Sequence, residues 1–368
     1  MVGKQTVNPE VIYIVFCALL AVPLAWFLPK ERIWVGIAFW TLLVIASLSL
    51  LSALWLIGAS ALTSVVMTAG DKLGHKNFLT LCCSLILVGS LLLSNMISGI
   101  LWIGGAYFIL RNLHVLFDWW MGRIVNPGLE RHLRYQLFLP VLIAGPINRI
   151  QHFERQCARQ RWDSATFFTG AERALFGSVQ LVVMGGWLID KIQFKLAENG
   201  ISSGGFWYDW LASVLDWARL YFTFAGFTSL ALGIALMMGL ALEENFNRPW
   251  KARNLIEFWS RWHITLSQWC RDYVFQPVTA MTRSPILGLI AAMIVIGMWH
   301  EVSVYYFLWA VWQVAGIIAT RVTLLCIERN PRLAVWPSAV PYLGPIFVIC
   351  WLSLAKPVLS RFLEIDLS

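Results

Sequence analysis

The sequence predicts an all-α, polytopic membrane protein, a helical bundle of about nine to eleven membrane elements that include re-entrant and interfacial helices. Three observations predict this fold class. The mean hydropathy is +0.68, and 59% of the residues are hydrophobic while only 13% are charged, a balance outside that of soluble globular domains. Several apolar runs are long enough to cross a hydrocarbon core of about 30 Å. The 21 Trp and 22 Phe suit the two membrane–water interfaces.

Charge and cysteine content narrow the possibilities further. The formal net charge of +8 fits the positive-inside rule of membrane proteins, so no nucleic-acid partner is expected. The seven cysteines are an odd number and lie mostly in apolar runs, which predicts reduced, buried thiols. No histidine stands at zinc-ligand spacing from the Cys82–Cys83 pair, and we expect no metal site. Since no linker or low-complexity tract interrupts the chain, we expect one integral-membrane domain over residues 1–368.

The N-terminal half begins with an apolar run at 11–28, which we interpret as a retained first helix because no small-residue cleavage pattern follows it. Residues 34–56 predict a second span. Residues 78–110 would be about 50 Å long as one helix, so we expect two elements with a break near Gly99, Gly104 and Gly105. Residues 137–147 (LFLPVLIAGPI) predict a broken or re-entrant segment, because two prolines and a glycine interrupt the run.

The C-terminal half continues the pattern. Residues 175–188 predict a span, and residues 207–242 are too long for one span, so we expect a division near 224–227. Residues 285–320 would extend about 54 Å if they formed one helix, and residues 336–354 predict the last span. Four arginines within 149–161 indicate that this segment is cytoplasmic.

A few polar side chains stand in apolar surroundings, where they are costly unless they are paired or solvated. Arg111 and Asp118 are most simply interpreted as a structural ion pair. His300 lies in GMWHEVSVYYFLW, and an imidazole can gain or lose a proton near pH 7. The alternative for His300 is a neutral side chain bonded to a neighbouring helix. A zinc-protease motif is excluded, because Val304 occupies the place of the second ligand. The histidines in polar loops are expected to face solvent: His75, His132 and His152.

The stretch 244–277 (ENFNRPWKARNLIEFWSRWHITLSQWCRDYVFQP) predicts an amphipathic helix. At about 100° per residue, one side collects the apolar residues Leu255, Phe258, Trp259, Trp262, Leu266, Trp269 and Tyr273. His263 falls at the edge of this stripe. Such a helix lies on a membrane surface or lines a polar cavity between spans, and the simpler alternative is an interfacial helix whose histidine reaches the headgroups.

Four segments resemble the membrane-bound O-acyltransferase family, in the branch of alginate O-acetyltransferases and the D-alanyl transfer proteins of teichoic acid. FLPVLIAGPINR at 138–149 resembles FPQLIAGPIVR, and YFTFAGFTSLALG at 221–233 resembles YFDFSGYSDMAIG. Residues 245–277 resemble NFxxPYxxxSIxEFWRRWHISLSxWLRDYLYxP, and GMWHEVSVYYFLW at 297–309 resembles GLWHGASWNFILW. The family-like core covers about residues 104–313.

The resemblance implies acyl transfer from a thioester to a hydroxyl. His300 takes the place of the family's essential histidine, the general base, and His263 takes that of its second histidine. His263, a nearby Trp or a backbone N–H would stabilise the oxyanion. A cluster of basic residues suits an anionic donor, either acyl-CoA or an acyl-phosphopantetheinyl carrier: Arg248, Lys251, Arg253 and Arg261. The residues expected to line a water-poor tunnel are Trp259, Trp262, Trp299 and Asn245.

The chain departs from the family pattern at several positions. Two family aspartates are replaced by Thr223 and Ser229, and two family glycines by Val278 and Thr279. The glycine after the essential histidine is Glu301, and a histidine near the end of the last block is Gln313. These differences leave the transfer chemistry in place and bear on the identity of the acceptor.

The resulting expectation is a multi-pass O-acyltransferase of the inner (plasma) membrane. It would move an acyl group, with acetyl preferred, from a cytoplasmic thioester to a hydroxyl of a cell-envelope or exported glycan. Two alternatives stay open: transfer of D-alanyl or another acyl group to a lipid or teichoic-acid acceptor, and non-catalytic transport of a lipid-linked substrate. We expect no permanently bound cofactor. The implied partners are membrane lipids, the thioester donor, and a periplasmic acyltransferase or glycan-export protein.

Overall fold

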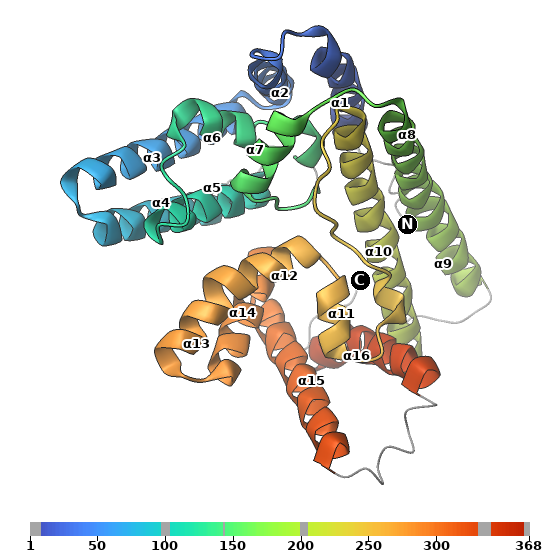
Figure 1. Ribbon diagram of the computed structural model, residues 1–368. Coiled ribbons are helices and arrows are strands. Elements are labelled where there is room, and N and C mark those ends of the chain that lie inside the picture. The colour runs from blue at the N-terminus through green and yellow to red at the C-terminus, as the bar shows by residue number, and fades with distance from the viewer. Residues whose placement is uncertain (1–8, 97–103, 143, 199–204, 330–339, 364–368) are drawn as a thin grey trace. The chain divides into compact units, whose positions relative to one another are not determined.

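A computed structural model describes residues 9–96, 104–142, 144–198, 205–329 and 340–363 (Figure 1). Within these ranges the chain is helical and contains no strand. In chain order the helices are α1 Pro9–Phe27, α2 Ile33–Leu48, α3 Leu50–Leu73, α4 Lys76–Met96, α5 Gly105–Trp120, α6 Gly128–Gln136, η1 Leu139–Val141, α7 Ile150–Arg159, α8 Ser164–Val179, η2 Gln180–Leu188, α9 Ile189–Glu198, α10 Phe206–Met237, η3 Pro249–Lys251, α11 Leu255–Arg261, α12 Ile264–Cys270, η4 Arg271–Phe275, α13 Gln276–Thr282, α14 Pro285–His300, α15 Val304–Arg329 and α16 Val340–Phe362.

Seven described helices are long and apolar enough to cross a membrane: Pro9–Phe27, Leu50–Leu73, Lys76–Leu93, Ser164–Glu198, Phe206–Met237, Val304–Arg329 and Leu343–Phe362. Two shorter apolar helices, Ile33–Leu48 and Pro285–His300, accompany them. Large apolar side chains such as Leu81, Leu85 and Phe168 are exposed on these helices, as lipid-facing positions are. The predicted fold class, a polytopic all-helical bundle, is confirmed. A helix suits a membrane because its backbone groups bond within the segment.

The described chain forms two compact units. Unit 1 comprises Met1–Gln180 and Gly226–Glu243, and unit 2 comprises Leu181–Ala225 and Glu244–Ser368. Helix α10 passes from unit 2 into unit 1 at Ala225. The expectation of a single domain over 1–368 stays a prediction.

In unit 1 the predicted single span at 34–56 is wrong, because the chain breaks at Ser49. Its backbone is extended (φ −156°, ψ 101°), and its hydroxyl accepts the N–H of Ser52, which caps α3 as N-terminal serines do. The division predicted within 78–110 is confirmed. Helix α5 starts after Gly104, whose φ of 69° lies in the left-handed region that glycine tolerates; Gly99 falls outside the described residues.

The Pro- and Gly-containing stretch at 137–147 is irregular, as predicted. Over the described residues of this stretch, which leave out residue 143, regular structure is limited to the short helix η1, and Phe138 before it is extended. The carbonyl of Ala144 accepts the hydroxyl of Thr228 at 3.1 Å. Non-helical backbone in a membrane protein needs such internal partners.

Helix α10 runs without a break for 32 residues, so the predicted division near 224–227 is wrong. Glycines in this region serve close packing within unit 1. A Cβ at Gly233 would stand 2.6 Å from both the backbone nitrogen of Ala174 and the carbonyl oxygen of Gly170 on α8. Similarly, a Cβ at Gly177 would stand 2.8 Å from the oxygen of Gly226. Small residues let two membrane helices approach at backbone distance.

The prediction that His132 faces solvent is also wrong. It is fully buried in unit 1, where its Nδ1 lies 3.2 Å from the hydroxyl of Ser64 and its Nε2 lies 3.2 Å from the Gln136 amide nitrogen. The polar sequence of α6 hid this, because its buried face packs on α3. His75 is exposed, as predicted, and His152 is partly buried.

The two charged residues of α5 have several neighbours in unit 1. Arg111 donates to the backbone carbonyls of Tyr135 and Gln136. The carboxylate of Asp118 lies 3.4 Å from His114 and 3.4 Å from Arg123. The bonds of Arg111 tie α5 to the C-terminal end of α6.

In unit 2 the predicted amphipathic helix at 244–277 is interrupted. Helix α11 ends at Arg261, Trp262 is extended, and α12 starts after His263. A π-helical turn, η4, follows α12. The apolar stripe still packs inward: Leu255, Phe258 and Trp262 form a core with Val348 and Leu352 of α16. The predicted loop near 282–284 is present, and Ser284 caps α14 by accepting the N–H of Leu287.

Candidate active site

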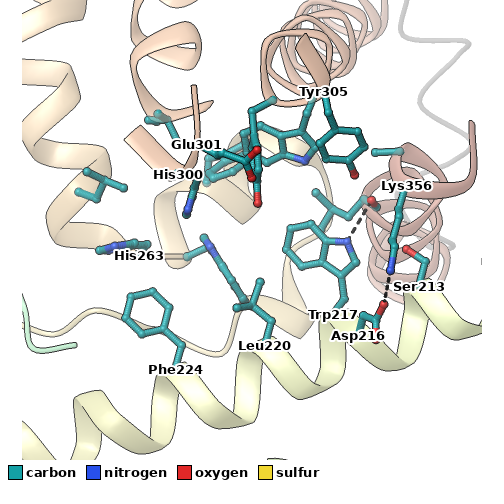
Figure 2. A pocket seen from close by; sticks show the side chains of 18 of the residues that line it. Ser213, Asp216, Trp217, Leu220, Phe224, His263, His300, Glu301, Tyr305 and Lys356 are labelled. Atoms are coloured by element: carbon teal, nitrogen blue, oxygen red, sulfur yellow. Dashed lines mark hydrogen bonds and ion pairs between the residues drawn. The ribbon is translucent and has the colours of Figure 1, made fainter. Parts of the chain in front are cut away.

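Unit 2 contains a cavity of about 560 Å³, shown in Figure 2. It is lined by residues from α10, α11, α12, α14, α15 and α16, together with the connections after α11 and α14. Both histidines singled out from the sequence, His263 and His300, line it. The segments that carry them are far apart in sequence, and the break after α11 turns His263 toward this space.

His263 is held by a specific local structure. It precedes α12 with left-handed backbone angles of φ 43° and ψ 53°, a conformation that costs a non-glycine residue free energy. The segment before α11 supports it: the N–H of Ile264 donates to the carbonyl of Asn245 at 2.9 Å. The side-chain oxygen of the fully buried Asn245 accepts the N–H of Thr265 at 3.3 Å and its hydroxyl at 2.7 Å.

These bonds fix the tautomer of His263. Because the backbone N–H of Thr265 can only donate, the Asn245 atom that it meets is the oxygen. The Nδ1 of His263 lies 3.2 Å from that oxygen and therefore carries the proton, which leaves a lone pair on Nε2. Burial, and then the nearby charge of His300, lower the pKa of His263 to about 3. His263 is thus a neutral hydrogen-bond acceptor at Nε2, and of the three oxyanion donors considered from the sequence, a Trp or a backbone N–H suits that contact better than this tautomer.

His300 has a different environment. It is the last residue of α14, because Glu301 turns the chain into extended geometry (φ −164°, ψ 136°). Its ring stacks on Tyr306 with centroids 5.7 Å apart and meets the ring of Trp309 edge-on. The imidazole is exposed and makes no hydrogen bond with the described part of the chain. Its nitrogens are therefore available to a ligand in the cavity.

The four residues predicted to line a tunnel all lie near the histidines: Asn245, which binds His263, and the three tryptophans Trp259, Trp262 and Trp299. Trp259 and Trp262 line the cavity, while the ring of Trp299 lies 6.0 Å from that of His263. The indole Nε1 of Trp259 is buried and has no hydrogen-bond partner among the described residues. An indole nitrogen can only donate, so this N–H is free to meet an acceptor in the cavity.

The four cations predicted to bind the donor lie elsewhere. Arg248, Lys251 and Arg253 are exposed on and beside η3, and none of the four lines the cavity. Arg261 binds the carboxylate of Glu257 at 2.7 Å and the carbonyl of Asn247 at 3.1 Å. Their role toward a donor stays a prediction.

The sequence did not single out the polar residues at the other end of the cavity. Asp216 of α10 and Lys356 of α16 form an ion pair at 2.9 Å, and Ser213 and Tyr305 also line this end of the space (Figure 2). A signal existed, because Asp216 and Lys356 each interrupt an apolar helix, and ionisable groups in such runs mark functional sites.

No group of three or more His, Cys, Asp or Glu side chains that could hold a metal ion occurs among the described residues. None of the seven cysteines, all of which lie in the described ranges, forms a disulfide bond, and three of them are buried. The side chains that line the cavity offer imidazole, indole and carboxylate groups.

Comparison with known proteins decides the family. Residues 38–360 match the sequence profile of MBOAT, the membrane-bound O-acyltransferase family. The chain belongs to this family. The resemblance drawn from the four sequence blocks is confirmed, and this MBOAT chain is a multi-pass membrane protein.

Several curated MBOAT-type relatives are similar to the chain. A probable alginate O-acetylase AlgI of Azotobacter vinelandii is 29% identical over 67% of this chain and 48% of its own length. A teichoic acid D-alanyltransferase of Bacillus subtilis is 29% identical over 50% of each chain. A peptidoglycan O-acetyltransferase of Helicobacter pylori is 30% identical over 50% of this chain and 38% of its own length. The chain spans about half the length, or less, of these relatives.

Proposed function

We propose that this chain is an O-acyltransferase that moves an acyl group, with acetyl preferred, from a cytoplasmic thioester to a hydroxyl of a cell-envelope or exported glycan at the inner membrane. One observation carries the proposal: a fixed neutral imidazole, His263, and an unengaged one, His300, line the same cavity. Family membership and the names of the relatives, which include acetylases and acetyltransferases, support it.

The reaction follows from the position of His300. An acceptor hydroxyl in the cavity would attack the thioester carbonyl carbon as a ring nitrogen of His300 takes its proton. The new C–O bond gives a tetrahedral intermediate, which collapses as the C–S bond breaks. The leaving thiolate then recovers the proton from His300. A positioned general base contributes about 10²–10⁴-fold to such a step.

Two neighbours would assist this base. The lone pair on Nε2 of His263 would accept a hydrogen bond and so orient the reacting groups. The free indole N–H of Trp259 would donate to the oxyanion of the intermediate, as preorganised donors do in acyl transfer. This arrangement gives the oxyanion role to an indole and the orienting role to His263.

The charge of the exposed surface near η3 supports an anionic acyl donor. The exposed cations Arg248, Lys251 and Arg253 would attract acyl-CoA or an acyl-phosphopantetheinyl carrier to the cytoplasmic face. A periplasmic acyltransferase or glycan-export protein would take the product onward. D-alanyl transfer to teichoic acid needs the same cavity chemistry, and the D-alanyltransferase relative of equal identity keeps it as the second candidate. Transport without catalysis would not need the His263–His300 arrangement.

The proposal is tested by His300→Ala and His300→Gln in purified protein. Transfer from a labelled thioester and the melting temperature are measured together. Loss of the base should lower transfer at least about 10²-fold with little change in melting temperature, since His300 is exposed. His75→Ala, at an exposed histidine of unit 1, is the matched control. Near-normal transfer by folded His300→Gln would show that the catalytic assignment is wrong.

A further inference from the structure

The cavity has two chemically different ends. His263 and His300 lie at one end, whereas Ser213, Asp216 and Lys356 lie at the other, with Trp217 between them (Figure 2). We call the second group, together with Ser360 and Tyr305, the polar end. Its residues come from α10, α15 and α16. The proposed chemistry at the histidines makes no use of it.

Helix packing does not explain the Asp216–Lys356 pair. Helices α10 and α16 are already joined by Trp210, whose indole donates to Ser353 at 2.9 Å, and by Trp217, whose indole donates to the carbonyl of Leu352 at 3.1 Å. The ion pair is 41% and 40% exposed on its two side chains, and pairs with that exposure add little to stability. Ionisable side chains kept in apolar helices indicate function.

A buried hydroxyl points to a ligand at the same end. Ser213 is 1% exposed, lines the cavity, and its Oγ has no hydrogen-bond partner in the described part of the chain. Burying a hydroxyl without a partner is unfavourable. A ligand group that both donates and accepts would satisfy it.

The charges in the cavity select the kind of ligand. Lys356 is the single cation of the lining and is already paired with Asp216, while Glu301 adds a second carboxylate. Glu301 is exposed beside His300, and its carboxylate forms no ion pair with any described residue. Burial lowers the pKa of His263 to about 3 and that of His300 to about 4, so both imidazoles are neutral, and two carboxylates and one ammonium leave the lining with an excess of one negative charge. A ligand carboxylate or phosphate would be repelled there.

We infer that the acceptor is an uncharged, hydroxyl-rich molecule, a neutral sugar unit, whose far hydroxyls bind Ser213, Asp216 and Lys356. Such a unit supplies donors and acceptors to the polar end and an apolar ring face to the walls formed by Trp217, Tyr305 and Tyr306. Hydroxyl recognition by otherwise unpaired buried groups gives strong selectivity. This inference rests on the proposed function, because it assumes that the reacting hydroxyl sits near His300.

The test compares two acceptors of equal length, a cello-oligosaccharide and an oligouronate, in full-length purified protein. Transfer of labelled acetyl from acetyl-CoA gives kcat/KM for each, and calorimetry without a donor gives each binding constant. The neutral oligosaccharide should be preferred at least about 10-fold in both measurements. Glu301→Gln and Asp216→Asn each remove a negative charge from the lining. Each should therefore raise kcat/KM and the affinity for the oligouronate, and so lower the ratio of neutral to charged acceptor.

The matched control is Asp209→Asn. Asp209 pairs with Arg361 at 2.6 Å between the same two helices but does not line the cavity, so the ratio should not change. Preference for the oligouronate would overturn this inference and leave the proposed function intact. An unchanged ratio of neutral to charged acceptor in the folded Glu301→Gln protein would do the same. Absence of transfer to either sugar with preferential binding of the neutral one would overturn the proposed function and leave the polar end as a neutral-sugar site. Absence of both transfer and binding would overturn both.

Discussion

At the scale of single residues, His263 shows how backbone geometry sets chemistry. Its left-handed conformation directs Nδ1 to Asn245, which fixes the proton on that nitrogen and leaves Nε2 as an acceptor. Its neutrality follows from burial. The useful property of this imidazole is therefore its tautomer, and under the proposed function His300 is the base that would exchange protons with the substrate.

His263 should make stability depend on pH. Its pKa falls from 6.5 to about 3 on folding, so between these values the unfolded chain binds more protons. The contribution of neutral His263 to the free energy of unfolding is complete above pH 6.5 and is lost as the pH falls toward 3. The loss between pH 7 and pH 5 amounts to about 2 kcal/mol. In His263→Asn, which retains a residue that tolerates the left-handed conformation, the melting temperature should fall less between these pH values. An equal fall in both proteins would contradict the assignment.

Residue types and their surroundings predicted much of this site. His263 and His300 were identified because an ionisable side chain in an apolar segment is costly and usually marks a functional site. In the structure both line one cavity. Asn245 was identified, but its contact with His263 was not, since 18 residues separate them. Asp216 and Lys356 were overlooked because their pairing depends on how α10 packs against α16, and other charges on the same helices, such as Asp209 and Arg361, do not reach the cavity.

At the scale of helices, hydrophobic periodicity located the apolar segments but not their breaks. The interruptions at Ser49 and His263 depend on a capping hydroxyl and on a left-handed residue, neither of which changes the apolar pattern. The opposite error occurred in α10, where glycines predicted a break. There the glycines accommodate a neighbouring backbone, a contact that the sequence of α10 alone does not contain.

The contact between α8 and α10 should be sensitive to a single methyl group. In Gly233→Ala the new Cβ would lie 2.6 Å from backbone atoms of Ala174 and Gly170, so the two helices must separate, at a cost of about 1–3 kcal/mol. Gly58→Ala is the control, because a Cβ at Gly58 meets nothing within 4 Å. Thermal unfolding in detergent should show a lower melting temperature for Gly233→Ala and no decrease for Gly58→Ala. Equal stability of the two variants would rule out the close contact.

At the scale of the whole molecule, fold class was the property best predicted from sequence. Composition and run length are sums over many residues, so single misplaced breaks do not change them. The division into two compact units was not predicted, because it depends on long-range packing, and α10 crosses the boundary as one unbroken helix.

The positive-inside rule gives a topological prediction for the whole chain. Arg155 and Arg253 are both exposed and belong to the two basic segments, so both should face the cytoplasm. In a Cys326→Ser background, which removes the exposed native thiol, Arg155→Cys and Arg253→Cys should react with an impermeant maleimide only after cells are permeabilised. Labelling of one position in intact cells would place the two segments on opposite faces.

The glycine-mediated contact of α8 with α10 also bears on how the molecule assembles. Gly170, Gly177 and Gly233 present backbone to backbone, and glycine has no side-chain rotamers to immobilise on docking. Most helix pairs lose side-chain freedom before their contacts are complete. The α8–α10 pair loses almost no side-chain freedom at its centre. We therefore expect α8 and α10 to associate early in the bilayer and to form a surface against which the remaining helices of unit 1 pack.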